Sequence, residues 1–305
     1  MRFTLKQLEY FVAAGERGSI TFAAEKVNIS QPSISAAITH LEAEFGVQLF
    51  IRHHAQGLSL TPEGMRMLRD ARALLRQAEE LQSVAGELSE LVSGPLAIGC
   101  LVTVYPLLVP ELVHSFRKRY ASARVHAVAS DQSGLFERLR SGEITIAVTY
   151  DMSVPADLAF EPLAHLPPFA FVAAGHPLAR QRSLSLQTLA EEPFLLLDLP
   201  HSREYFLALF HQLGLTPRMA GRFEHMDVIR SLVARGDGFG LANIKPRMRS
   251  SLDGRRLAYL DLEDRIPPLT LGLASVRGLR HTRTAEAFLG MCRELVREGQ
   301  VPGAA

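Results

Sequence analysis

Short apolar stripes at helical spacing, separated by polar turns, run through the first sixty residues of the chain. Apolar side chains recur at three- and four-residue intervals over 5–17, which predicts an amphipathic helix. A second stripe over 20–27 follows Ser19, and a third over 31–44 follows Ser30. Both serines are placed to cap the helix that follows them. Two short helices joined by a tight turn are typical of a helix-turn-helix.

The third predicted helix has one apolar stripe, and the rest of its surface is small or polar. The apolar residues are spaced four, three and four apart, so the other side of the helix is available to a partner. The residues on that side are Gln31, Ser33, Ser35, Ala36, Thr39 and His40. Residues 47–51 and 58–61 then alternate like the two arms of a hairpin, which adds a predicted wing.

A long heptad pattern follows the predicted wing. Thr61 and Pro62 are typical of a helix start, and apolar residues then recur at alternating intervals of four and three. This stripe consists of Met67, Ala71, Leu74, Ala78, Leu81, Ala85, Leu88 and Val92. A strict 3.5-residue period favours contact between two chains, so we predict a dimerisation helix over 63–92. Its main contacts are expected at Leu74, Leu81 and Leu88; the alternative is a helix that packs within one chain.

After Ser93-Gly94-Pro95 the sequence alternates between apolar strands and helical patterns. The predicted strands, all of parallel character, are 96–100, 125–129, 144–149, 169–173, 194–197, 238–242 and 269–274. The predicted helices between them are 105–119, 133–140, 202–213, 225–235 and 281–297. This alternation predicts an α/β domain whose helices cover the faces of the sheet, and its length favours two lobes.

The composition is that of an ordinary globular protein. Of the 305 residues, 47% are hydrophobic and 21% charged, which argues against a disordered or fibrous chain. The chain has only two cysteines, Cys100 and Cys292, which are too few for a disulfide framework. We expect both thiols to be buried and inert. No stretch approaches the roughly 18 apolar residues that span a bilayer, and the N-terminus lacks a signal-peptide core. We therefore expect a cytoplasmic protein without membrane contact.

Signatures of catalysis and metal binding are missing from the sequence. Ser202 beside His201 lacks a nucleophile motif, and the glycines of 236–240 precede a predicted strand instead of following one. The pair His53-His54 lacks further ligands at zinc-like spacing. We expect no enzymatic activity, no cofactor and no metal site.

The charge balance limits how the predicted helix-turn-helix can bind nucleic acid. The chain has a net charge of +1, and residues 1–60 contain five basic and five acidic side chains. Attraction to phosphates grows with the number of Lys and Arg contacts. A neutral module must therefore rely on a few well-placed contacts and on being dimeric.

Several runs of sequence resemble the signature of LysR-type transcriptional regulators. In the first part of the chain they are 8–12 (LEYFV), 18–25 (GSITFAAE), 30–35 (SQPSIS), 41–42 (LE), 46–52 (GVQLFIR) and 60–64 (LTPEG). A weaker resemblance continues at 142–147 (GEITIA), 175–179 (GHPLA) and 238–241 (GFGL). The first group of motifs is dense and highly specific for this family.

The resemblance implies a domain organisation. It places a winged helix-turn-helix at 1–62, a linker and dimerisation helix at 63–92, and an effector-binding domain at 93–305. The effector domain of the family is similar to periplasmic binding proteins, with two α/β lobes, two crossovers and a ligand in the cleft. The resemblance implies that 94–164 and 268–305 form lobe one, and that 165–267 form lobe two.

The resemblance also implies which residues contact DNA. Gln31, Pro32, Ser33 and Ser35 match the start of the family's recognition helix, and Arg52 matches its wing arginine. Glutamine can pair with an adenine edge, and serine hydroxyls can reach bases or phosphates. Where many family members have an arginine after the second serine, this chain has Ala36. Recognition of the DNA sequence is therefore expected to depend more on Gln31, Thr39 and His40, and on the shape of the DNA groove.

Effector-binding residues follow from a separate rule. Ligands of open α/β sheets bind beyond the carboxyl ends of strands, near helix N-termini that favour anions. This rule selects Val102, Thr103, Ser130, Gln132, Ser133, Tyr150, His201, Ser202 and Arg203, of which Thr103 and Gln132 also match family positions that touch effector. Phe206 is expected beside them as an apolar contact for the ligand. We expect a small organic anion, a carboxylate with an apolar body. Cys100 and Cys292 do not match the cysteine pair of the family's peroxide-sensing branch.

The combined interpretation is a ligand-responsive transcriptional regulator. It is expected to bind double-stranded DNA at an interrupted dyad, and the resemblance implies a homotetramer built as a dimer of dimers that also contacts RNA polymerase. The alternative is an α/β solute-binding or enzymatic protein whose N-terminal helices serve only protein contacts.

Overall fold

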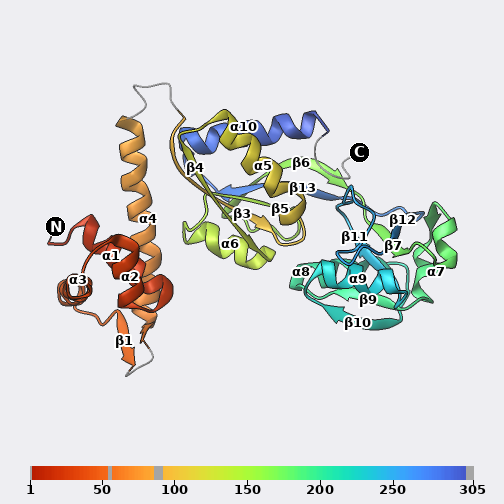
Figure 1. The fold of residues 1–305 in the computed structure, drawn as a ribbon, viewed down its shortest axis with the longest axis horizontal. Coiled ribbons are helices and arrows are strands. Elements are labelled where there is room, and N and C mark those ends of the chain that lie inside the picture. Colours follow the sequence, from red (N-terminus) through yellow and green to blue (C-terminus); the bar gives the residue numbers. More distant parts are fainter. Residues whose placement is uncertain (1, 54–56, 86–91, 300–305) are drawn as a thin grey trace. The chain divides into compact units, whose positions relative to one another are not determined.

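The computed structural model describes residues 2–53, 57–85 and 92–299 (Figure 1). The chain divides into two compact units, Met1–Leu91 with Arg138–Ile144 and Val92–Glu137 with Thr145–Ala305. Among the described helices, none combines the length and the apolar character needed to cross a membrane.

Three short helices form the first part of the chain. They are α1 (Leu5–Arg17), α2 (Ile20–Val27) and α3 (Gln31–Phe45). Ser19 and Ser30 cap α2 and α3 as predicted, because each hydroxyl accepts a bond from a backbone N–H in the first turn. Asn28 adopts a left-handed conformation with φ of 52°, which ends α2 and begins the tight turn. The predicted helix-turn-helix is confirmed.

A two-stranded hairpin packs on these helices. β1 (Phe50–His53) pairs antiparallel with β2 (Gly57–Leu60), which confirms the predicted wing. Phe50 is buried and meets Phe11 of α1 edge to face, with ring centroids 5.5 Å apart. This aromatic contact joins the base of the wing to the apolar core of the helices.

The long helix α4 (Pro62–Ala85) begins directly after the wing. Its first three turns belong to the core of the same unit, because Ala71 is 2% exposed and Met67 packs against that core. The heptad stripe therefore starts as a contact within the chain, which corrects the prediction that the whole stripe faces a second chain. Leu74 is 38% exposed. Leu88 and the side chain of Leu81 lie outside the described residues.

The second unit begins with a five-stranded sheet in the order β4-β3-β5-β13-β6. The strands are β3 (Gly94–Leu101), β4 (Ala123–Ser130), β5 (Ile146–Tyr150), β6 (Leu158–Leu166) and β13 (Leu269–Val276). Its helices are α5 (Tyr105–Arg119), α6 (Gln132–Arg140) and α10 (Arg283–Arg297). Figure 1 shows α5 and α10 on the same side of this sheet, where Phe116 and Phe288 pack with centroids 5.5 Å apart. We call this sheet and its helices the first lobe.

A second group of strands forms the second lobe. A four-stranded sheet in the order β11-β7-β12-β8 is joined to the pair β10-β9 through a bridge between Phe194 and Phe239. The strands are β7 (Phe169–Ala173), β8 (Ser183–Leu184), β9 (Phe194–Leu197), β10 (Met219–Phe223), β11 (Gly240–Ala242) and β12 (Leu257–Leu262). The helices are α7 (Leu186–Ala190), α8 (Pro200–His211) and α9 (Met226–Arg235), with a 3₁₀ turn at Pro177–Arg180. The two-lobed α/β prediction is confirmed.

The prediction that all strands run parallel is wrong. β13 pairs antiparallel with both β5 and β6, and β7 pairs antiparallel with β11 and β12. The chain leaves the first lobe after β6 and returns through β13, so the returning strand runs against its neighbours. Four strands were not predicted: β6, β8, β10 and β12. β6 and β10 were missed because residues such as Pro162 and Arg222 interrupt their apolar pattern.

A close backbone approach in the first unit makes a testable prediction. Gly64 lies in α4, where an added Cβ would sit 2.1 Å from the carbonyl oxygen of Leu49. Gly64→Ala should therefore destabilise this unit by about 1 to 3 kcal/mol, although alanine ordinarily favours helix. Gly290 in α10 has no atom within 4 Å of such a Cβ, so Gly290→Ala should stabilise the protein by about 1 kcal/mol. Urea unfolding of both full-length variants checks the two signs, and equal effects would contradict the structure.

Candidate functional site

The start of α3 presents a polar surface above a buried apolar stripe. Ile34, Ile38 and Leu41 are 0–2% exposed and anchor the helix on the core. Of the predicted DNA-contacting residues of this helix, Gln31, Pro32, Ser33, Thr39 and His40 are exposed and Ser35 is half-buried. The structure therefore brings these predicted residues together on the outward side of one helix.

Two local contacts orient side chains on this surface. The Ser33 hydroxyl lies 2.8 Å from the Ser30 hydroxyl, so one of its hydrogen bonds is made within the helix cap. His40 Nδ1 lies 3.4 Å from the Gln7 amide nitrogen of α1, which ties the middle of α3 to the neighbouring helix. Gln31 and Thr39 make no side-chain hydrogen bond within the described residues. Their polar groups are available to a partner.

The wing carries the predicted arginine. Arg52 is exposed on β1, and among the described residues it makes no ion pair. The neighbouring His53 Nε2 lies 2.8 Å from Ser59 Oγ of β2, which closes the hairpin with a side-chain contact. His53 thus has a structural partner within the hairpin.

A cavity of about 840 Å³ lies in the second unit between segments of both lobes. The first lobe contributes the residues after β3 and the first turns of α5, and the second lobe contributes α8, the start of α9 and 242–252. Five of the ten predicted effector residues line it: Val102, Thr103, Tyr150, Ser202 and Phe206. A volume of this size is typical of a small-molecule site.

The other five predicted effector residues do not line this cavity. They are Ser130, Gln132, Ser133, His201 and Arg203. Ser133 Oγ and His201 Nε2 share a hydrogen bond of 3.2 Å between the two lobes, and Arg203 donates to Asp198 over 2.8 Å. Ser133 and His201 satisfy each other, and sequence spacing does not reveal this contact because the two residues lie in different lobes.

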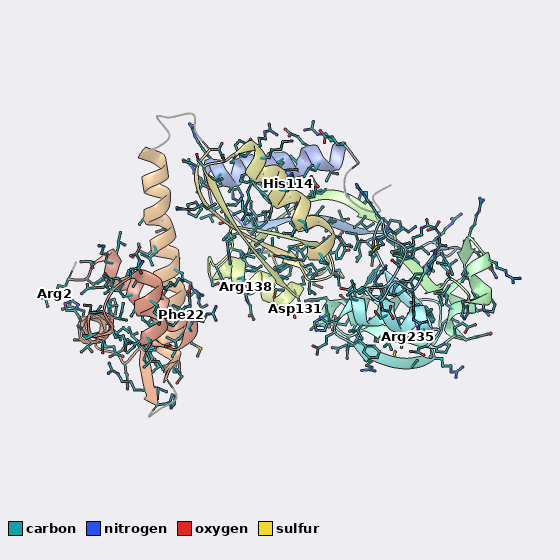
Figure 2. The ribbon with its side chains drawn as sticks, viewed as in Figure 1. Arg2, Phe22, His114, Asp131, Arg138 and Arg235 are labelled. Atoms are coloured by element: carbon teal, nitrogen blue, oxygen red, sulfur yellow. The ribbon has the colours of Figure 1, made fainter. Side chains whose placement is uncertain are left out.

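Gln132 has a structural role that the sequence did not indicate. Its side chain is 2% exposed, and its amide nitrogen donates to the carbonyl oxygens of Tyr150 and Met152. Tyr150 ends β5 and Met152 follows it, at the point where the chain turns toward β6. Asp131, labelled in Figure 2, accepts a hydrogen bond from the Gly134 N–H at 2.8 Å and caps the same helix. Gln132 therefore holds the exit of β5 against the start of α6.

Arg230 is a cavity residue that the sequence analysis missed. It lines the cavity from α9 and is 6% exposed. Its Nη2 donates to the carbonyl oxygens of Ser250 at 2.9 Å and Met248 at 3.3 Å. The guanidinium also lies 5.6 Å from the Tyr259 ring centroid and 5.9 Å from that of Phe171.

Arg230 has no acidic partner among the described residues, which is unusual for a buried cation. A sequence signal for it did exist. It lies next to Ile229 and three residues before Val233, both buried, so a charge falls at the edge of the apolar stripe of α9. Charge at such a position is a reason to look for a buried functional group.

Two phenols lie at the boundary of the lobes. Burial raises the pKa of Tyr205 to about 12 and raises the pKa of Tyr150 far above its usual range. Both hydroxyls therefore stay neutral at physiological pH. The amide nitrogen of Asn243, which is 5% exposed, donates to the Tyr205 hydroxyl at 3.1 Å and to the Leu166 carbonyl at 3.0 Å. This network supports the cavity wall where β6 leaves the first lobe.

Both thiols are buried in the first lobe. Cys100 is 0% exposed and Cys292 is 2% exposed. Burial raises the pKa of the Cys100 thiol far above its usual range and raises that of Cys292 to about 12. In the part of the chain that the structure describes, no three metal-ligating side chains cluster.

Comparison with protein-family models identifies both parts of the chain. The model described as "Bacterial regulatory helix-turn-helix protein, lysR family" matches residues 5–65. The model described as "LysR substrate binding domain" matches residues 89–297, which is more than half of the chain. The first match contains the exposed surface of α3, and the second contains the cavity.

Relatives with the same organisation are regulators. The crystal structure of HinK, a LysR family transcriptional regulator from Pseudomonas aeruginosa, is 37% identical, covers 96% of this chain and 99% of its own, and superposes with a TM-score of 0.65. The HTH-type transcriptional regulator TdfR of Cupriavidus pinatubonensis is 31% identical over 86% of this chain and 90% of its own. A hydrogen peroxide-inducible genes activator of Pectobacterium carotovorum is 29% identical over 88% and 89%. The chain therefore belongs to the LysR family of bacterial helix-turn-helix transcriptional regulators, which bind DNA and respond to ligands.

Proposed function

We propose that this regulator binds an interrupted dyad in promoter DNA as a homo-oligomer, and that a small carboxylate in the cavity of the second unit controls it. The observation that carries the proposal is the outward surface of α3, where five predicted contact residues are exposed above a fully buried stripe. A polar helix surface supported in this way fits the major groove.

The chemistry of this surface favours a few specific contacts over general attraction. The Gln31 amide can donate to and accept from an adenine edge, and the free Thr39 hydroxyl can reach bases or phosphates. Arg52 on the wing supplies a cation for the backbone or the minor groove. Because the module has no net positive charge, two modules bound together give the affinity that one lacks.

Removal of the Gln31 amide tests the major-groove contact. Gln31→Ala should weaken binding to the DNA upstream of the protein's own gene by about 1 to 3 kcal/mol, because the amide pairs with a base edge. Gel-shift titration measures this, with Gln187→Ala, an exposed glutamine on α7, as the matched control. Unchanged affinity of the Gln31 variant would refute its assignment.

The exposed part of the α4 stripe is the proposed dimer contact. Leu74 is 38% exposed although it lies between core residues of the same helix, and a second α4 would remove it from water. Leu81 and Leu88 continue the proposed contact along the stripe. The proposed assembly is a dimer of dimers, in which this contact pairs two DNA-binding modules at the spacing of successive major grooves.

A charge in the proposed contact tests the dimer. Leu74→Asp should reduce the mass of the particle in solution, because an unpaired carboxylate would be buried between two helices. Light scattering measures the mass. Arg69→Asp introduces the same side chain at an exposed position off the stripe and should leave the mass unchanged. An intact assembly of the Leu74 variant would contradict the proposed contact.

The proposed control is a shift between two arrangements of the lobes. A ligand that contacts α5 and α9 at once favours the arrangement in which both line the cavity, and it must bind the two arrangements unequally to act. Arg230 supports a carboxylate, since this buried cation has no acidic partner among the described residues. The resulting change in the spacing of the DNA-binding modules would alter the bend of the DNA and the contact with RNA polymerase.

The two cysteines are proposed to be structural, although several relatives are named as hydrogen peroxide-inducible activators. Raised pKa values keep both thiols protonated, and the thiolate is the form that reacts. Neither thiol should react with Ellman's reagent at pH 8 in the native protein, and both should react after unfolding in guanidinium. Mass spectrometry after peroxide treatment should show no disulfide; a linked Cys100–Cys292 pair would contradict this assignment.

A further inference from the structure

α9 presents two opposite charges to the cavity that do not pair with each other. Asp227 and Arg230 both line the cavity and are three residues apart, about 4.5 Å along the helix axis. Opposite charges at this spacing ordinarily form an ion pair on the helix surface. Among the described residues neither side chain is in an ion pair. An unpaired carboxylate and an unpaired guanidinium therefore lie one turn apart on the same wall.

The packing around Arg230 explains why it forms no ion pair with Asp227. The two hydrogen bonds from Nη2 to the carbonyls of Met248 and Ser250 direct the guanidinium toward that loop, and the rings of Tyr259 and Phe171 flank it. Asp227 lies in the first turn of α9 and is exposed. The carbonyl bonds and ring contacts hold the cation but supply no negative charge, so its charge remains uncompensated.

The remaining lining of the cavity combines apolar and polar side chains. The apolar ones from both lobes include Val102, Leu107, Leu197, Phe206, Ile244 and Leu269, and the other charged ones are Glu111, Glu224 and Arg247. The apolar side chains favour a ligand with a hydrophobic body, and among the charged lining residues Arg230 is the buried one.

We propose that the cavity binds a zwitterion of the α-amino-acid class with an apolar side chain. The ligand's carboxylate pairs with Arg230, its ammonium group pairs with Asp227, and its side chain packs on the apolar wall. The two charged groups of an α-amino acid are close enough to bridge side chains that lie one helical turn apart. This inference rests on the proposed role of the cavity as the effector site. It adds an ammonium group to the carboxylate of the proposed ligand.

A ligand with only one charge would leave one protein charge unpaired in the complex. Sites built for two polar groups discriminate strongly against analogues that lack one of them. We expect the amino acid to bind about tenfold or more tightly than its deaminated or decarboxylated analogue.

The experiment uses the full-length protein and calorimetric titration. The twenty common L-amino acids are tested singly, and for each that binds, the matched analogues are tested as well. For L-phenylalanine these are 3-phenylpropionate, which lacks the ammonium group, and 2-phenylethylamine, which lacks the carboxylate. The expected result is binding of at least one apolar amino acid, with both analogues weaker by about tenfold or more.

Variants assign the two contacts. Asp227→Asn should remove the preference for the amino acid over its deaminated analogue, and Arg230→Gln should remove the preference over its decarboxylated analogue. Arg235→Gln is the matched control, because Arg235, labelled in Figure 2, ends the same helix. It forms an ion pair of 2.9 Å with Asp253 and does not line the cavity. Circular dichroism checks that the Arg230 variant folds. Because Asp227 is exposed, its substitution should leave the fold intact, so the Asp227 variant tests the inference even if the Arg230 variant does not fold.

Three results would overturn the inference: no binding of any of the twenty amino acids, equal binding of the amino acid and its analogues, or loss of binding in the Arg235 variant alone. Tight binding of 3-phenylpropionate alone would refute the zwitterion and leave a carboxylate effector in place. Footprinting on the upstream DNA tests the regulatory function separately, because it needs no ligand.

Discussion

Burial of one apolar stripe on α3 is the constraint on which the DNA-binding unit depends. Ile34, Ile38 and Leu41 are removed from water against α1 and α2, so the opposite side of the helix must face outward. The exposure of Gln31 and Thr39 follows directly from the burial of the opposite side of the helix. A unit without net positive charge can then act on DNA, because the few polar groups that it has are held in fixed positions.

In the second unit, polar side chains are buried at the wall of the cavity. Arg230 is held there by two backbone carbonyls and two rings without a counter-charge, and Asn243 braces the neighbouring wall through Tyr205. Buried polar groups that are fixed in this way discriminate against any ligand that leaves one of them without a hydrogen-bond or ionic partner. The helix N-termini at Ser133 and His201, which have the residue types of an anion site, are instead used to join the lobes.

Much of the fold was predictable because its signals are local. The caps Ser19 and Ser30, the hairpin of the wing and the strands 169–173 and 194–197 are each encoded within a few residues. Strands such as β6 and β10 were missed because their pairing, and not their own hydrophobicity, makes them strands. The heptad period of α4 predicts that the stripe is buried, but it does not indicate what covers it. The structure shows that Met67 and Ala71 pack within their own chain.

By itself, the sequence determined the family, the helix-turn-helix and the outward residues of α3, because these depend on periodicity, capping and motif spacing along neighbouring residues. Only the tertiary structure decided which side chains meet across long separations. It placed Ser133 against His201, turned β13 against β5, and brought Arg230 to the carbonyls of a distant loop. Such contacts depend on how segments far apart in the sequence pack together, and no local pattern records that geometry.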